Sequence, residues 1–167
     1  VVLDVGGAAG AYSYWLAARG YEVHLVDPVP LHIRQAQEAA AKHPAPLASA
    51  RVGDARALER GGASVDAVLL LGPLYHLQER GARLAALREA WRVLRPGGWL
   101  FAAGISRFAS LLDGLRTGMI FDEPAFAAIV ERDLADGRHR NDTGTLAFFT
   151  TAYFHRPEEL AAEVAEA

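Results

Sequence analysis

The chain has 167 residues, of which 51% are hydrophobic and 22% charged, and its formal net charge is −3. This length and composition suit one domain with a substantial core. The mild negative charge argues against a nucleic-acid-binding surface, the lack of cysteine excludes disulfides and thiolate chemistry, and no apolar run reaches the ~20 residues that cross a bilayer. We therefore expect a cytoplasmic protein. Lys42 is its only lysine beside many arginines, a usage typical of GC-rich bacterial genomes.

The first 27 residues predict a strand, a tight turn, a helix and a second strand. An apolar run ends at Asp4, the segment GGAAG fills residues 6–10, a helix continues to about residue 19, and the next strand ends on Asp27. Glycine is needed where a backbone bends sharply or lies against a ligand, and a carboxylate after the second strand can accept both hydroxyl hydrogens of a ribose. The unit predicts a nucleoside-binding half-site. The alternative is a glycine turn and a solvated carboxylate without a ligand.

The spacing of the glycines distinguishes between two kinds of nucleoside. A dinucleotide-binding turn has glycine at its first, third and sixth positions, so that the backbone can approach a pyrophosphate. Counted from Gly6, the third and sixth positions are Ala8 and Ala11, and counting from Gly7 gives no better match. The spacing disfavours a nicotinamide-dependent oxidoreductase, which we keep as an alternative.

The segment DVGGAAG resembles the first motif of the class I S-adenosylmethionine (SAM)-dependent methyltransferases, an acid followed by x-Gly-x-Gly-x-Gly, with Ala8 at the middle glycine. Three further segments resemble later motifs in family order: ARVGDARAL, SVDAVLLLGPLYHL and LREAWRVLRPGGWLFAAG. From the first to the last, these segments span residues 4–104, about three-fifths of the chain. The resemblance is nearest to the small-molecule group that contains the quinone-biosynthesis C-methyltransferases.

The resemblance implies SAM as the cofactor and S-adenosylhomocysteine as its product. It places the methionine portion at the turn from Asp4 to Gly10, the ribose at Asp27, and the adenine at Asp54 and the backbone N–H of Ala55. The cofactor-binding residues that it implies are Asp4, Gly6, Ala8, Gly10, Asp27, Pro28, Asp54, Ala55 and Leu71.

The predicted elements alternate between strand and helix, with strands near residues 1–5, 21–26, 48–52, 65–71 and 98–104. Such alternation predicts a Rossmann-like, doubly wound α/β fold, in which a mainly parallel sheet carries helices on both faces. The helix before the fifth strand has a predicted core face and a predicted outer face. We assign Leu84, Leu87, Trp91 and Leu94 to the first and Arg83, Glu89 and Arg92 to the second, with Pro96-Gly97-Gly98 ending the helix.

Residues 105–148 follow the fifth strand and predict a pair of amphipathic helices. The apolar positions are Leu111, Leu112 and Leu115 on one helix, and Phe126, Ile129, Val130 and Leu134 on the other. An insertion here lies above the carboxyl edge of the sheet. It predicts a lid over the substrate or, equally, an extension of the core. We assign residues 1–167 to one methyltransferase domain, and we expect a fragment of a longer protein because the family's C-terminal hairpin is absent.

Methyl transfer depends mainly on holding the nucleophile in line with the methyl group, with a general base where the acceptor must lose a proton. Tyr75 and His76 are the catalytic candidates, because the family lines its transfer site with the loop after the fourth strand. For His76, ordinary packing is an equal alternative; for Tyr153 and His155 packing is favoured. The remaining histidines are expected at the surface or its boundary: His24, His32, His43 and His139.

The chain lacks the sequence motifs of several methyltransferase subclasses. Leu71-Gly72-Pro73-Leu74 differs from the Asn/Asp-Pro-Pro-aromatic motif of enzymes that methylate DNA amino groups. Leu70 and Leu71 stand where metal-dependent catechol enzymes carry carboxylates, and no cluster has metal-ligand spacing, so no metal is expected. A small-molecule acceptor with an O, N or C nucleophile remains. A non-catalytic SAM-binding module is the other alternative, since acceptor pockets follow no fixed motif.

Overall fold

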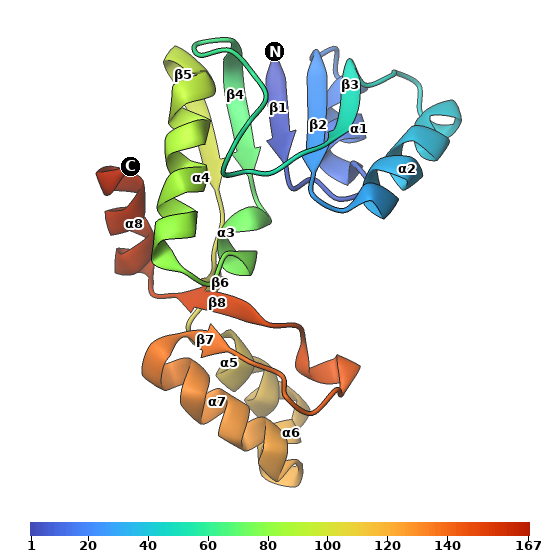
Figure 1. Ribbon diagram of the computed structural model, residues 1–167. Coiled ribbons are helices and arrows are strands. Elements are labelled where there is room, and N and C mark those ends of the chain that lie inside the picture. Colours follow the sequence, from blue (N-terminus) through green and yellow to red (C-terminus); the bar gives the residue numbers. More distant parts are fainter.

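A parallel five-stranded sheet, in the order β3-β2-β1-β4-β5, forms the centre of the computed structural model, which describes residues 1–167 (Figure 1). The chain runs outward from β1 to β3 and then returns to the other side of β1, which confirms the doubly wound fold. The strands are β1 (Val2–Val5), β2 (Val23–Asp27), β3 (Ser49–Val52), β4 (Val65–Leu70) and β5 (Leu94–Ala102).

Helices cover both faces of this sheet. The helical elements up to β5 are α1 (Ala11–Ala17), α2 (Pro30–Ala39), the short 3₁₀ helix η1 (Ala40–Lys42), α3 (Pro73–His76) and α4 (Arg80–Val93), and the chain ends with α8 (Pro157–Glu166). In Figure 1, α4 and α8 lie on one face and α1 on the other. None of the helices is both long and apolar enough to span a membrane.

The core follows from the alternation of side chains along the strands. Leu3 and Val68 face α4, where they pack with Leu87 and other buried residues. Val2 points to the opposite face and packs with Ala17 of α1. Both faces of each central strand are therefore buried, which explains why β1 and β4 are almost wholly apolar in sequence.

The fifth strand begins earlier than the sequence predicts. Leu94 is already extended and pairs with Val65, whereas the next paired residues are Ala67 and Trp99. The extra residues between Leu94 and Trp99 form an irregularity in the strand, so Pro96 and Gly97 lie inside β5 instead of between the helix and the strand. A proline is tolerated at a sheet edge with irregular pairing because no ladder hydrogen bond is required of it.

The outer and inner faces of α4 also differ from the prediction. Arg83, assigned to the outer face, is 2% exposed, whereas Trp91, assigned to the core face, is 42% exposed. The Arg83 guanidinium pairs with Glu163 of α8, and this partner lies 80 positions away in sequence. Helical periodicity cannot detect such a partner, because it treats every arginine as solvent-exposed.

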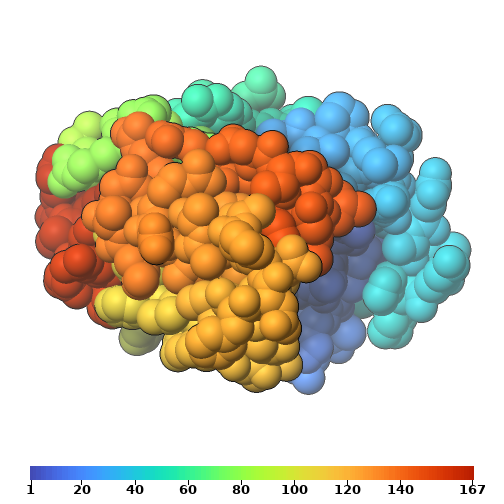
Figure 2. All heavy atoms as spheres, turned by 90° about the horizontal axis from the view of Figure 1, so that it is seen from below, coloured from blue at the N-terminus to red at the C-terminus, as the bar shows by residue number.

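Residues 105–155 form a second packed unit at the carboxyl end of the sheet. It contains the strands β6 (Ile105–Ser106), β7 (Arg138–His139) and β8 (Ala152–His155) and the helical elements α5 (Ala109–Thr117), α6 (Met119–Asp122), α7 (Pro124–Asp136) and η2 (Leu146–Phe148). The three strands form a separate small sheet in the order β6-β8-β7. Figure 2, which views the molecule from below, shows this unit in front of the sheet's carboxyl edge.

The helices of this unit pack on a small core of their own. Phe126, Ile129, Val130 and Phe148 are buried together, and Leu111 and Leu134 lie against them. Leu112 and Leu115, predicted to share the apolar face of Leu111, are 62% and 51% exposed. The core of this unit is too small to cover all the leucines of α5, so only one side of that helix is buried.

His139 is buried in this unit and does not lie at its boundary, contrary to the sequence prediction. Its Nδ1 lies 2.8 Å from Asp133 Oδ2, and its Nε2 lies 2.8 Å from the carbonyl oxygen of Phe148. Because a carboxylate and a carbonyl are both acceptors, both ring nitrogens must donate, which favours the imidazolium form. Burial alone would lower the pKa of His139, but the hydrogen bond and charge of Asp133 raise it above the ordinary value of 6.5.

We expect the unit to loosen as the pH rises. A folded-state pKa above the unfolded value means that the stabilisation is complete below about pH 6.5 and is lost as the pH passes the raised pKa. Hydrogen exchange of amides in residues 109–148, measured from pH 6 to pH 9 and corrected for intrinsic rates, should show falling protection. His139→Gln should remove most of this pH dependence. Protection that stays constant in the unchanged protein would contradict the assignment.

Candidate active site

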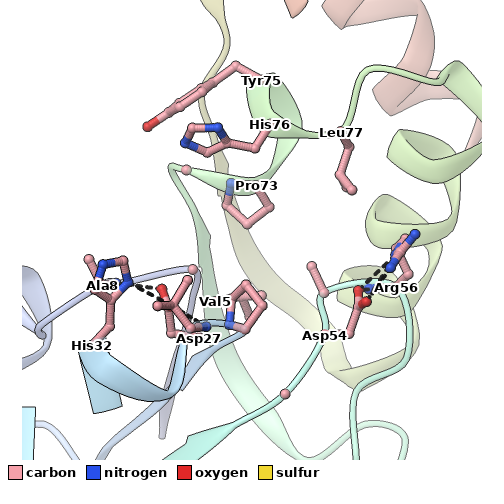
Figure 3. A pocket seen from close by; sticks show the side chains of 16 residues that line it. Val5, Ala8, Asp27, His32, Asp54, Arg56, Pro73, Tyr75, His76 and Leu77 are labelled. Atoms are coloured by element: carbon pink, nitrogen blue, oxygen red, sulfur yellow. Dashed lines mark hydrogen bonds and ion pairs between the residues drawn. The ribbon is translucent and has the colours of Figure 1, made fainter. Parts of the chain in front are cut away.

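A cavity of about 520 Å³ opens at the carboxyl edge of the sheet, where the strand order reverses between β1 and β4 (Figure 3). Ligands bind at this position in open α/β sheets, and the volume is typical of small-molecule sites. The loops that follow β1, β2, β3 and β4 supply the lining. Its residues are Val5, Gly6, Ala8, Asp27, Pro28, Val29, His32, Gly53, Asp54, Ala55, Arg56, Gly72, Pro73, Tyr75, His76 and Leu77.

The glycine turn after β1 is packed so closely that a side chain at Gly6 has no space. Gly6 has φ +71°, and a Cβ atom there would lie 2.6 Å from Cγ of Pro73 in the loop after β4. A Cβ atom at Gly7 would lie 2.4 Å from Oδ2 of Asp4. Glycine at position 6 therefore lets the loops after β1 and β4 approach each other above the sheet, and glycine at position 7 lets the turn lie against Asp4.

Replacing Gly6 with alanine should lower the free energy of unfolding by more than backbone strain alone would lower it. Gly20→Ala is the matched control, because Gly20 has φ +86° and open space around its Cα. We expect about 1–2 kcal/mol for the control, from the left-handed backbone. For Gly6→Ala we expect a further ~1–3 kcal/mol from the clash with Pro73. Urea denaturation checks both values, and equal losses in the two variants would show that the close contact is unimportant.

Asp27 is the buried carboxylate of the cavity. It lies at the end of β2 and is 4% exposed. Its Oδ2 accepts the N–H of Ala8 at 2.9 Å, and its Oδ1 accepts the N–H of Val29 and the Nδ1–H of His32, each at 2.9 Å. These bonds fix the carboxylate between the glycine turn and the first turn of α2.

Asp4 supports the glycine turn from beneath it and does not line the cavity. The Ser13 hydroxyl of α1 donates to Asp4 Oδ2 at 2.6 Å. Burial and the negative charge of Asp27 raise the pKa of Asp4, while the Ser13 hydrogen bond opposes the shift. Gly10 is likewise outside the lining and forms the left-handed N-cap of α1, with φ 86°.

Asp54 lines the cavity beside Ala55 but is paired with a neighbour. The Arg56 backbone N–H donates to Asp54 Oδ1 at 2.8 Å, and Arg56 Nε donates to the same oxygen at 2.9 Å. The Arg56 hydrogen bond lowers the pKa of Asp54 against a smaller effect of burial. Apart from the histidines, Arg56 is the only cationic residue that lines the cavity, and it is paired with Asp54. The cavity therefore has no free guanidinium or ammonium group that could bind a pyrophosphate.

Tyr75 and His76 form the wall of the cavity that the loop after β4 contributes (Figure 3). They lie on α3, and their ring centroids are 4.7 Å apart. Burial lowers the pKa of His76, although the charge of Asp27 opposes this shift. The His76 ring is therefore neutral at physiological pH and can accept a proton. Leu71 does not line the cavity; its neighbour Gly72 does.

Tyr153 and His155, for which packing was favoured, lie outside the cavity. His155 is 3% exposed, with Nε2 3.3 Å from Glu163 Oε2. The Tyr153 ring lies against the Arg83 guanidinium, whose Cζ is 3.8 Å from the ring centroid. Both residues join β8 to the helices α4 and α8.

His32 and Arg56 line the cavity although neither was a predicted site residue, and Arg56 lies within the motif segment ARVGDARAL. His32 was expected at the surface or its boundary, and its side chain is 37% exposed. It lies in the first turn of α2, which follows the end of β2 closely. Pro30 at the start of that helix is the sequence signal that could have placed it, because the first turn of a helix following a β-strand stays at the carboxyl edge of the sheet.

The fold and the cavity define a Rossmann-like nucleoside-binding domain of the class I SAM-dependent methyltransferase type. Residues 2–98 match the family described as a methyltransferase domain, and the chain belongs to that family. S-Adenosylmethionine is accordingly its cofactor. The residues present fit that group, because the small residues Gly6 and Ala8 line the cavity and Asp27 offers it a buried carboxylate.

Individual relatives and solved structures are similar to this chain. The chain is 33% identical over 106 residues to a ubiquinone biosynthesis O-methyltransferase of Methylobacterium nodulans, a match that covers 64% of this chain and 41% of that protein. A SAM-dependent methyltransferase structure from Methanosarcina mazei superposes with a TM-score of 0.75 at 24% identity, covering 99% of this chain and 77% of that one. A Pyrococcus horikoshii protein gives 0.59 at 29% identity, covering 69% and 53%.

Proposed function

We propose that the protein transfers a methyl group from SAM to an oxygen, nitrogen or carbon nucleophile of a small-molecule acceptor. The observation that carries this proposal is the position of Asp27 and His76 as lining residues of one cavity. The first is a buried carboxylate suited to a ribose, and the second is a neutral imidazole on the facing loop. The chain spans less than half the length of the curated relative, so the acceptor is proposed from this site and not from that relative's name.

The proposed cofactor contacts follow the order of the loops. Gly6 and Ala8 of the first loop would lie against the methionine portion, with Asp4 holding that loop from below and Gly10 starting the helix behind it. Asp27 and Pro28 would hold the ribose. Asp54 and the Ala55 N–H would hold the adenine, and Leu71 would place the loop that carries Tyr75 and His76.

The bound cofactor supplies a sulfonium whose methyl group is already activated for displacement. The chain's own contribution is to position the acceptor and, for an O–H or N–H acceptor, to take up its proton. His76 would accept that proton at a ring nitrogen, since burial keeps the imidazole neutral. Tyr75 would contact the acceptor with its ring. A positioned base contributes roughly 10²–10⁴-fold.

We further propose that residues 105–148 act as a lid within a single domain spanning residues 1–167. Two features support this role: these residues have a core of their own, and they belong to the unit of residues 105–155 that lies in front of the sheet's carboxyl edge (Figure 2). No residue of the unit lines the cavity, so it would have to move to cover the acceptor.

A methyl-transfer assay over a panel of metabolites tests the proposal. The unchanged protein should methylate at least one acceptor, and for an O–H or N–H acceptor His76→Ala should lower the rate by roughly 10²–10⁴-fold while retaining S-adenosylhomocysteine binding. His24→Ala is the control, because His24 bonds to Ser49 away from this cavity. Cofactor binding without transfer to any acceptor would favour the non-catalytic module and overturn the enzymatic proposal.

A further inference from the structure

The hydrogen bonds around Asp27 leave little of its carboxylate free. An ionised carboxylate has about four lone-pair sites on its two oxygens. The Ala8 N–H occupies one site on Oδ2, while the Val29 N–H and the His32 Nδ1–H occupy both sites on Oδ1. One site, on Oδ2, remains.

A ribose presents two neighbouring hydroxyl groups, each with one hydrogen to donate. Asp27 as it is held here can accept one of them. The second hydrogen requires another acceptor at the same end of the cavity, unless one of the existing bonds breaks.

His32 provides that acceptor. Its Nδ1 must carry a proton, because the carboxylate opposite is an acceptor. In the neutral ring Nε2 is then an acceptor, and it makes no hydrogen bond within the chain. The side chain is 37% exposed and lines the cavity together with Asp27. Figure 3 shows the ring beside the Asp27 carboxylate.

We propose that His32 is a second ribose-binding residue, which accepts one ribose hydroxyl at Nε2 while Asp27 accepts the other at Oδ2. This proposal rests on the proposed cofactor site. It differs from a purely structural role for His32, in which the ring would only orient Asp27 and would never contact the ligand.

Removing one ligand hydroxyl at a time separates these two roles. The dissociation constants of S-adenosylhomocysteine and its 2′-deoxy and 3′-deoxy analogues are measured by calorimetry with the unchanged protein and with His32→Ala. We expect each deoxy analogue to bind the unchanged protein about 3- to 10-fold more weakly. In His32→Ala one of the two deoxy analogues should bind about as tightly as S-adenosylhomocysteine itself. The other analogue should still bind more weakly, because Asp27 still accepts the hydroxyl that it lacks.

Two further variants sharpen the test. His32→Asn can keep an N–H donor at the position of Nδ1 but has no atom at the position of Nε2, so it should lose the same hydroxyl discrimination as His32→Ala. Gln35→Ala, on an exposed position of the same helix, should retain both penalties. Thermal unfolding of all variants verifies that they fold.

The measured dissociation constants can contradict the proposal in three ways. If both penalties are unchanged in His32→Ala and His32→Asn, the ring does not contact the ribose and the inference is overturned. If both variants bind S-adenosylhomocysteine more tightly, His32 blocks a hydroxyl position and must be displaced, which also overturns it. If the unchanged protein does not bind S-adenosylhomocysteine at all, the proposed function fails, and the inference fails with it.

Discussion

Replacing Asp27 with asparagine should weaken S-adenosylhomocysteine binding by at least tenfold, equivalent to about 1.4 kcal/mol. Asp27 receives hydrogen bonds on both oxygens, from Ala8 on one and from Val29 and His32 on the other. An asparagine amide turned either way therefore sets its NH₂ group against at least one N–H donor. The substitution removes a charged acceptor and also disturbs the loops that it joins.

Calorimetric titration checks this expectation, with thermal unfolding measured on the same samples to separate binding from folding. Asp113→Asn is a suitable control, because Asp113 is an exposed carboxylate on α5 paired only with Arg116 among side chains. An unchanged dissociation constant in a folded Asp27→Asn variant would remove Asp27 from the ligand site.

Replacing Arg83 with methionine should lower the free energy of unfolding by about 3–5 kcal/mol, because it deprives the buried Glu163 carboxylate of the guanidinium that pairs with both its oxygens. Arg83 and Glu163 are 2% and 3% exposed, and Arg83 Nε and Glu163 Oε2 are 2.9 Å apart. Arg83 Nη1 also donates to the carbonyl oxygens of Leu77 and Gln78. The pair thus connects α4, α8 and the end of the loop that carries His76.

Urea denaturation of Arg83→Met, Glu163→Leu and the double variant measures this coupling. The double variant should be more stable than either single one, because it leaves no unpaired charge in the core. Burial alone would raise the pKa of Glu163, but the hydrogen bonds and charge of Arg83 lower it. The stabilisation is therefore lost as the pH falls through that lowered pKa. Strictly additive losses would show that the two residues act independently.

The parts of the fold that sequence reasoning found are those that depend on neighbours along the chain. The turn from Gly6 to Gly10 needs glycine for local steric reasons, and Asp27 ends a strand whose residues are buried on both faces. Such features leave a signal within about 30 residues, which is why both strands and the acid at the end of the second strand could be predicted. The alternating order of strands and helices then defines the doubly wound sheet.

The features that sequence reasoning missed depend on polar partners that a pattern of apolar positions does not reveal, whether 80 positions away, as for Arg83, or six and nine positions away, as for His139. Arg83 is buried because Glu163 of α8 neutralises it, and His139 is buried because Asp133 and the Phe148 carbonyl accept its two protons. A pattern of apolar positions assigns such residues to the surface. Leu112 and Leu115 show the opposite error, since an apolar helix face does not reveal whether anything covers it.

Some residues of the candidate site could be predicted from the sequence and others could not. Tyr75 and His76 could be placed in the cavity because the loop after β4 follows a recognisable motif. The hydrogen bond between His32 and Asp27 could not be predicted, because it depends on how the first turn of α2 is oriented above β2. Side-chain partnerships of this kind depend on the three-dimensional arrangement of the loops.

The central claim is that the cavity at the reversal of strand order holds a sulfonium-bearing nucleoside and not a pyrophosphate-bearing one. Calorimetric titration of the unchanged protein with S-adenosylhomocysteine and, in parallel, with NAD tests it most directly. We expect saturable one-site binding of S-adenosylhomocysteine and no comparable binding of NAD. Tighter binding of NAD, or no binding of S-adenosylhomocysteine, would contradict the account.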